Sequence, residues 1–229
     1  GRVARDIFFQ GIASPARLVD ADRLLDLLPG LAFGWPYRVE EADPSLQPFY
    51  LIRALSGADL LLCENLLQAG DQRRLDALNA LCDLFAALAV ALPNSDHRLI
   101  CLHAAAVVVS GRLLIFPNVR RAGKSTLSVA LAAEGHGLVG DDVVPLAFDA
   151  QGRAWARALG LQPRLRLPLP EGASDAFRAQ VMAPGGAQNR QYRYVSLQGQ
   201  PVHGTLFPDP TFVILDRRDR PVSARIEAV

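Results

Sequence analysis

The pattern of hydrophobic and polar residues divides the chain into three stretches. Over residues 1–70, short apolar runs such as Ile7–Phe9 and Tyr50–Ile52 are separated by turn residues such as Pro29-Gly30. Short apolar runs bounded by Gly and Pro are typical of strands joined by turns. The pattern therefore predicts a small β-rich N-terminal region with one short helix near Asp20 to Leu28. We expect this region to serve structure or partner recognition.

A helical period begins at Asp71. Apolar residues recur three and four positions apart, with Asp71 as a candidate N-cap and Pro93-Asn94 after the expected end. These residues are Leu75, Leu78, Leu81, Cys82, Phe85, Leu88 and Ala89. The spacing predicts a long core helix within residues 71–98, which connects the N-terminal region to a domain at residues 99–229.

The third stretch begins with strand-like runs. Residues Leu99–Val107 are apolar except for His103, and Val107–Val109 is predicted to pair with Leu113–Phe116 across a turn at Ser110-Gly111. A single His in such a run is usually a core residue. Here it precedes a strand that feeds a loop of interest, so a role in chemistry stays open beside the structural one.

A helix and further strands follow. Residues Ser125 to Glu134 have helical spacing and end before Gly135, and Gly137–Gly140 is a short strand candidate. The segment Met182–Arg190 is polar and is either a substrate loop or a solvent loop. Later strand candidates are Arg153–Leu159, Tyr192–Leu197, Thr211–Leu215 and Val222–Ile226.

Composition narrows the function only slightly. The 229 residues are 50% hydrophobic, and 24 Lys and Arg nearly balance 23 Asp and Glu, so no basic field favours nucleic acid. The three cysteines show no C-x-x-C spacing, which favours a reducing cytoplasm. We find no apolar run of about 18 residues and no leader pattern, so neither a membrane nor secretion is expected.

The segment Phe116–Thr126 has the features of a phosphate-binding loop. It follows a predicted strand, ends in Gly123-Lys124-Ser125 and opens a predicted helix, as the pattern G-x-x-x-x-G-K-[ST] requires. Asn118 stands where the first glycine is expected, and Arg120 and Arg121 replace small residues. Because Asn tolerates a left-handed backbone, the loop can still form.

Two acidic residues and two arginines complete the candidate chemistry. Asp141-Asp142 follows the strand after this helix, a position where an aspartate holds Mg²⁺ in phosphate-loop proteins. Arg164 and Arg166 alternate, so they share one face if the segment is extended. They form either a solvated edge or a phosphate clamp.

These segments resemble the catalytic domain of the HPr kinase/phosphorylase family and its HprK-related kinase relatives. The resemblance covers residues 99–148 and reaches weakly to Leu215-Asp216-Arg217. It rests on Leu102-His103-Ala104-Ala105-Ala106, Ala122-Gly123-Lys124-Ser125-Thr126 and Gly137-Leu138-Val139-Gly140-Asp141-Asp142. It implies an α/β (α+β mixed) fold with a P-loop kinase core of the HPr kinase and phosphoenolpyruvate carboxykinase type and a mixed β-sheet.

The resemblance also implies an activity, namely phosphoryl transfer from ATP, with Mg²⁺, to a serine hydroxyl. Lys124 would bind the β- and γ-phosphates, Ser125 and Asp142 would hold the metal, Asp141 would be the base, and His103 would support the base or the phosphoryl group. The nucleotide would lie against Asn118, Val119, Arg120, Arg121, Ala122, Gly123, Lys124, Ser125 and Thr126. The expected partners are a nucleotide and a hydroxyl acceptor, with a homo-oligomer left open.

Two functions compete. The first is an ATP- and Mg²⁺-dependent kinase acting on a protein, peptide or small-molecule hydroxyl, favoured by Lys124, Ser125 and the two aspartates. The second is a degenerate kinase that binds nucleotide or phosphate as a regulatory or scaffold module without turnover. Arg120 and Arg121 separate the two, because they either grip a phosphate or fill the nucleotide pocket. A plain NTPase lacks an obvious residue to orient water.

Overall fold

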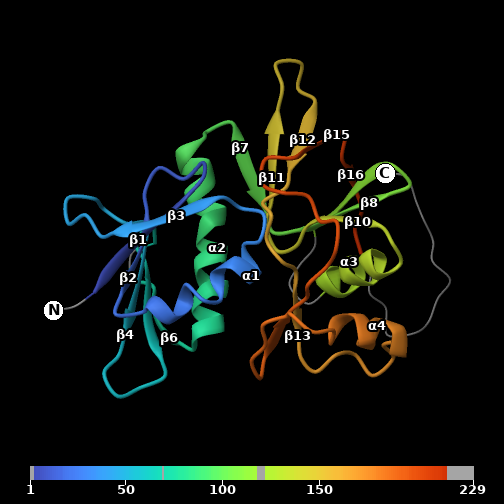
Figure 1. Ribbon diagram of the computed structural model, residues 1–229. Coiled ribbons are helices and arrows are strands. Elements are labelled where there is room, and N and C mark those ends of the chain that lie inside the picture. The colour runs from blue at the N-terminus through green and yellow to red at the C-terminus, as the bar shows by residue number, and fades with distance from the viewer. Residues whose placement is uncertain (1–2, 69, 118–121, 216–229) are drawn as a thin grey trace.

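The N-terminal part of the chain forms one sheet. The computed structural model describes residues 3–68, 70–117 and 122–215, and within them the protein is mixed α/β with several sheets (Figure 1). The six-stranded N-terminal sheet is antiparallel except where β2 and β4 run parallel. Its strand order is β3 (Tyr37–Glu41), β1 (Ala4–Phe9), β2 (Ala16–Val19), β4 (Tyr50–Ala54), β5 (Leu61–Asn65) and β6 (Gln72–Leu75).

The short helix predicted near Asp20 to Leu28 is wrong in its position. The structure has a 3₁₀ turn, η1 (Asp22–Leu24), followed by α1 (Leu28–Leu31). Pro29 lies in the first turn of α1, where its missing N–H removes no helical hydrogen bond. The Pro29-Gly30 pair therefore belongs to a helix and does not end one.

The long core helix is α2 (Ala77–Ser95), and both of its predicted ends are wrong. Residues Gln72–Leu75 pair with β5 as strand β6, so the N-cap is Asp76, whose carboxylate accepts a 2.9 Å hydrogen bond from Asn79 N. Pro93 lies inside the last turns, where the helix loses one hydrogen bond and still continues to Ser95. The spacing of apolar residues placed the start of the helix at Asp71, but the pairing of Gln72–Leu75 with β5 moves it to Asp76.

Helix α2 has the length and composition of a membrane span, although no apolar run of about 18 residues was expected from the sequence. Its apolar window has a mean hydropathy of 1.5, and 56% of that window is buried inside the protein. It contacts β4, β5 and β6 on one side and β7 on the other, so it lies between the N-terminal sheet and the rest of the chain (Figure 1). It has the burial of a core helix.

Three smaller sheets follow α2. The first has the order β10 (Gly137–Gly140), β8 (Ala105–Val109), β9 (Arg112–Phe116) and β16 (Thr211–Phe212). The second has the order β15 (Leu206–Pro208), β12 (Ala154–Arg157), β11 (Val144–Phe148) and β7 (Leu99–Leu102), and the third pairs β13 (Arg164–Arg166) with β14 (Tyr192–Tyr194). The first is a mixed sheet because β16 runs parallel to β9.

The predicted hairpin is confirmed, whereas the predicted continuous strand Leu99–Val107 is wrong. Strands β8 and β9 pair across Ser110 and Gly111, which have φ of 48° and 77°, the left-handed conformation of a two-residue hairpin turn. The run from Leu99 divides at His103, because β7 pairs with β11 in one sheet and β8 with β9 in another. His103 therefore stands where the chain crosses between sheets.

The helix predicted at Ser125 to Glu134 is confirmed as α3 (Lys124–Ala133), which packs on β8 and β10. A second helix, α4 (Asp175–Val181), was missed because its Pro- and Gly-containing surroundings indicated turns. Its signals were the N-cap Ser174 and the buried pair Phe177 and Val181. Strands β12, β14 and β16 lie within the predicted runs, and Val222–Ile226 lies outside the described residues.

The N-terminal sheet and the later sheets share one core. The largest cluster of buried residues joins β1 to β5 and α2 with Leu99, Val143, Leu159 and Tyr194 from the C-terminal part. Backbone contacts add to this junction, because Gly34 N donates to Gly160 O at 3.0 Å and His203 N donates to Gly34 O at 2.8 Å. The division of the chain at residues 70 and 98 stays a prediction.

Candidate functional site

The site is built around the start of α3. Gly123 is its N-cap and has a φ of 92°, a left-handed conformation that favours glycine. The first N–H groups of the ten-residue helix therefore open toward the turn that carries Ala122 and Gly123, as an anion site requires. Ala122 and Thr126 are half-buried there. The predicted loop residues Asn118, Val119, Arg120 and Arg121 lie outside the described residues.

Lys124 is buried, with a relative exposure of 6%. Its ammonium charge acts to lower the pKa of both His103 and Asp142, although the pKa of His103 is raised overall. The structure thus brings the predicted lysine, histidine and carboxylate into one electrostatic neighbourhood, although the three come from different elements.

The two aspartates follow β10 and have different surroundings. The pairing of β10 with β8 shifts register between Leu138 and Gly140, and Asp142 adopts a positive φ of 72°. This conformation is uncommon outside glycine, and Asp is among the residues that tolerate it. As a result, the neighbouring carboxylates have separate partners.

Asp141 is bound to the start of α3 and to β13. The Ser125 side chain lies close enough to lower the pKa of its carboxylate, and Oδ2 accepts a 3.2 Å hydrogen bond from Arg164 N. Oδ1 is buried and has no hydrogen-bond partner among the described residues. Burial, together with the negative charge of Asp142, raises the pKa of Asp141 to about 6. Ser125 and Arg164 act in the opposite direction and lower this pKa, but they do not cancel the effect of burial.

Asp142 is held by a histidine and an arginine. His103 Nδ1 lies 3.1 Å from Oδ1, and Arg164 Nη2 donates to Oδ2 at 2.8 Å. Burial acts to raise the pKa of Asp142, but the bond to His103 and the charges of Arg164, His103 and Lys124 lower it overall. The hydrogen bond to Asp142 raises the pKa of His103 in turn, although partial burial opposes this.

Arg164 and Arg166 were expected to form either a solvated edge or a phosphate clamp, and their surroundings differ. It binds Asp142 and stacks on the Tyr192 ring at 4.5 Å, while the exposed Arg166 lies 5.2 Å from the same ring. The shared face is confirmed, because the intervening Leu165 is buried on the other side. A solvated edge therefore describes Arg166 but not Arg164.

Three residues beside the aspartates carried no sequence signal. Cys82, Gln162 and Tyr194 line a narrow crevice together with Asp141 and Asp142, and Cys82 Sγ lies 3.1 Å from the Tyr194 hydroxyl. They come from α2, a loop and β14, so no local spacing could associate them. Only the packing of α2 against the C-terminal sheets places them here.

The contacts rearrange the expected metal site. Ser125 acts on the pKa of Asp141, while both oxygens of Asp142 are engaged by His103 and Arg164, and the metal role expected for Ser125 and Asp142 stays a prediction. Across the described residues there is no group of three or more His, Cys, Asp or Glu side chains that could hold a metal. A hydroxyl beside a carboxylate with an unpartnered oxygen is a donor set that fits Mg²⁺ when phosphates complete it.

Comparison with known proteins gives a partial similarity to a solved structure. No protein-family model matches the chain, and no curated protein matches it. Among solved structures, the chain is similar to the HPr(Ser) kinase/phosphatase from Coxiella burnetii, with 32% identity over 25% of this chain and 37% of that chain, and a TM-score of 0.23. The similarity covers little of either chain.

Proposed function

We propose that this protein transfers a phosphoryl group from ATP, with Mg²⁺, to a hydroxyl acceptor. The observation that carries the proposal is the contact between Ser125, at the glycine-capped start of α3, and Asp141, whose second carboxylate oxygen is buried and unpartnered among the described residues. A hydroxyl at a helix start paired with a carboxylate after a neighbouring strand is the arrangement that phosphate-loop enzymes use.

On the nucleotide side, the chain offers fixed positive charge. The N–H groups at the start of α3 and the Lys124 ammonium would bind the phosphates, because both favour anions. Phosphoryl transfer passes through a loose transition state that is rich in charge, so positioning and neutralisation supply most of the catalysis. Buried groups such as Lys124 are effective here because less solvent screens them.

Ser125 and Asp141 would hold Mg²⁺, which supplies charge neutralisation of the phosphates when it is bound. The raised pKa of Asp141 reflects the burial of its carboxylate, which the charges of the described residues around it do not offset. A cation beside it favours the ionised form, so the two residues and the metal are mutually compatible. This assignment replaces the expected metal role of Asp142.

On the acceptor side, we assign the proton transfer to His103. Asp142 is ionised because its pKa is lowered, so it only accepts hydrogen bonds, and His103 Nδ1 must carry the proton between them. Nε2 is then free to take the proton of the attacking hydroxyl late in transfer. Asp142 orients the ring and stabilises its charged form, and Arg164 holds Asp142 in place.

The assignments are tested by measuring phosphate release and transfer from ATP with a panel of hydroxyl acceptors. We expect Lys124→Ala to abolish both turnover and nucleotide binding. His103→Gln should lower turnover by about 10²- to 10⁴-fold, the usual contribution of a general base, without weakening nucleotide binding. Asp141→Asn should abolish Mg²⁺-dependent turnover, because it removes a metal ligand. Full turnover in His103→Gln, with none in Asp141→Asn, would return the base role to Asp141.

The second candidate function, binding without turnover, has one observation in its favour. Arg164 forms a 2.8 Å ion pair with Asp142 and so neutralises a carboxylate that a transferring enzyme would use. Under this alternative the wild-type protein binds ATP and Mg²⁺ but releases no phosphate with any acceptor. The same assay therefore separates the two functions.

A further inference from the structure

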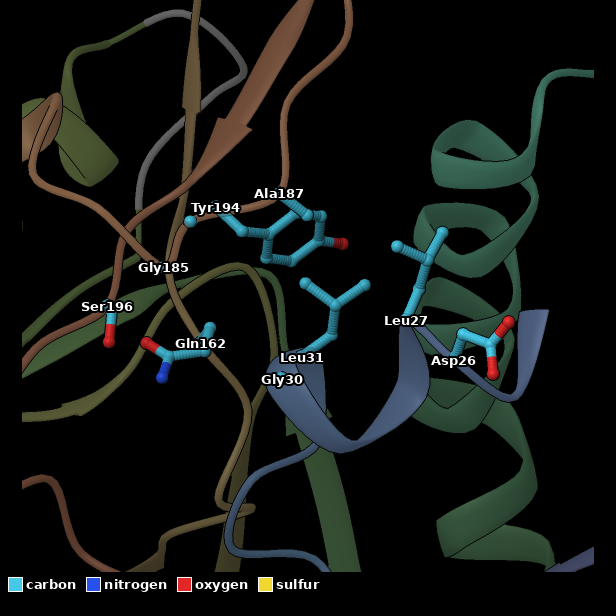
Figure 2. A pocket seen from close by; sticks show the side chains of 10 residues that line it. Asp26, Leu27, Gly30, Leu31, Gln162, Gly185, Ala187, Tyr194 and Ser196 are labelled. Atoms are coloured by element: carbon cyan, nitrogen blue, oxygen red, sulfur yellow. The ribbon is translucent and has the colours of Figure 1, made fainter. Parts of the chain in front are cut away.

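A cavity lies beside the candidate site. It has a volume of about 270 Å³ and lies between α1 and the loop that carries Gly185 and Ala187 (Figure 2). Leu27 and Leu31 come from the N-terminal region, whereas Gln162, Tyr194 and Ser196 come from the C-terminal part. The cavity exists only because the two parts of the chain pack together.

The cavity adjoins the two carboxylates of the site. Gln162 and Tyr194 line it, and both also line the crevice of about 20 Å³ that contains Asp141 and Asp142. A molecule in the cavity would thus be separated from the carboxylates only by these two side chains and a space of about one water molecule. A hydroxyl group is small enough to enter such a space.

The lining has a neutral polar end and an acidic end. Gln162 Oε1 is buried without a hydrogen-bond partner among the described residues, and Ser196 also lines the cavity (Figure 2). Asp26 is exposed and lies at the opposite edge of the lining, beyond Leu27 and Leu31. The arrangement suits a molecule with a hydrogen-bonding end, an apolar middle and a cationic end.

The volume limits the size of the occupant. Pockets for drug-sized ligands measure about 300–1,000 Å³, so this cavity accepts a small molecule and not a folded domain. We propose that the cavity binds the phosphate acceptor, and that this acceptor is a small hydroxylated amine whose ammonium group meets Asp26 and whose hydroxyl end lies toward Gln162. The proposal rests on the proposed function and assigns its substrate class.

The test measures binding of linear amino alcohols of increasing chain length in the absence of nucleotide, by ligand-observed NMR or calorimetry. We expect one chain length to bind best and its N-acetylated counterpart, which has no charge, to bind at least tenfold more weakly. Asp26→Asn keeps the size of the side chain and removes its charge, so it should abolish this preference for the amine.

A second variant fills the cavity. A side chain added at Gly30 meets no atom within 4 Å and needs no unusual backbone conformation, so Gly30→Phe should fold and should block binding. Gly172→Phe is the matched control, because Gly172 has the same freedom and lies outside the cavity. We expect the control to bind amino alcohols as the wild type does, and ATP to stabilise both variants equally.

The outcomes separate this inference from the proposed function. Amino alcohols that bind wild type and Lys124→Ala alike but are never phosphorylated support the cavity assignment and contradict the kinase function. Binding of no amino alcohol, or equal binding by Gly30→Phe, overturns the cavity assignment even if ATP is turned over with another acceptor.

Discussion

Asp141 and Asp142 are adjacent in the sequence, yet their environments shift their pKa values in opposite directions. Asp141 is half-buried near a serine hydroxyl with its Oδ1 fully enclosed, and Asp142 is bound by His103 and Arg164. Pairs of carboxylates with divergent pKa values are a recurrent feature of sites that divide acid, base and metal roles. The sequence indicated that the two aspartates form a site. It did not indicate the partner of each carboxylate, because the direction of each side chain depends on the positive φ of Asp142.

Asp141→Asn is expected to stabilise the protein above pH 6 while it removes Mg²⁺-dependent turnover. The folded-state pKa of about 6 lies above the ordinary value of 3.8, so folding becomes less favourable as the pH rises from 3.8 to 6. The full penalty applies above pH 6 and amounts to at most about 3 kcal/mol at 1.36 kcal/mol per pKa unit. Urea unfolding at several pH values measures it.

The pH profile supplies the control for that experiment. At pH values below 3.8 both the folded and the unfolded wild type carry a neutral carboxyl group at position 141, so the variant should gain little stability there. A gain that is the same at all pH values would mean that Asn packs better, and would contradict the burial of a charged carboxylate.

At the scale of elements, turn residues and periodicity correctly predicted the helices and strands whose packing partners are near in sequence. The hairpin β8–β9 and helix α3 were found because their turns, Ser110-Gly111 and Gly135, require left-handed backbone. The start of α2 was misplaced and the break at His103 was missed, because each depends on pairing with a strand from elsewhere in the chain. Periodicity cannot show such pairing.

Asp76→Ala is expected to lower the stability of the fold through α2. The carboxylate accepts hydrogen bonds from Asn79 N at 2.9 Å and from Asn189 Nδ2 at 3.2 Å, so its loss removes a helix cap and a link to the C-terminal part. Loss of such a cap costs about 1 kcal/mol, or roughly 2–4 °C in Tm for a chain of this size. A thermal melt measures the change.

Asp71→Ala is the comparison for the capping prediction, since Asp71 was the N-cap that spacing indicated. Its carboxylate pairs with the exposed Arg73, and exposed ion pairs contribute little. A larger loss of stability in Asp71→Ala than in Asp76→Ala would contradict the placement of the helix start.

At the scale of the whole molecule, the site depends on a junction that no sequence pattern indicated. Cys82 from α2 and Tyr194 from β14 meet beside the aspartates, and Trp35 stacks on His203 at 4.8 Å between ring centroids. The N-terminal region was expected to serve structure or partner recognition, and the shared core supports the structural part of that expectation. The binding experiment with amino alcohols tests whether the N-terminal region also takes part in recognition.

Gly160→Ala is expected to destabilise this junction. A Cβ atom at Gly160 would lie 2.4 Å from Gly34 C, so one backbone must move. Gly152→Ala is the matched control, because Gly152 has a similar φ of 78° against 73° but meets no atom within 4 Å. We expect Gly160→Ala to be less stable than the control by roughly 1–3 kcal/mol, the usual range for overpacking. Equal stability in urea unfolding would contradict the close contact.

The measurement that tests the central claim most directly is a thermal melt with and without ATP and Mg²⁺, for the wild type and for Lys124→Ala. A ligand at a hundredfold its Kd adds about 2.7 kcal/mol of stability. We expect the wild-type Tm to rise only when ATP and Mg²⁺ are both present, and the Tm of Lys124→Ala to stay unchanged. A wild-type Tm that does not respond to ATP, GTP or Mg²⁺ in any combination would contradict a nucleotide site at the start of α3.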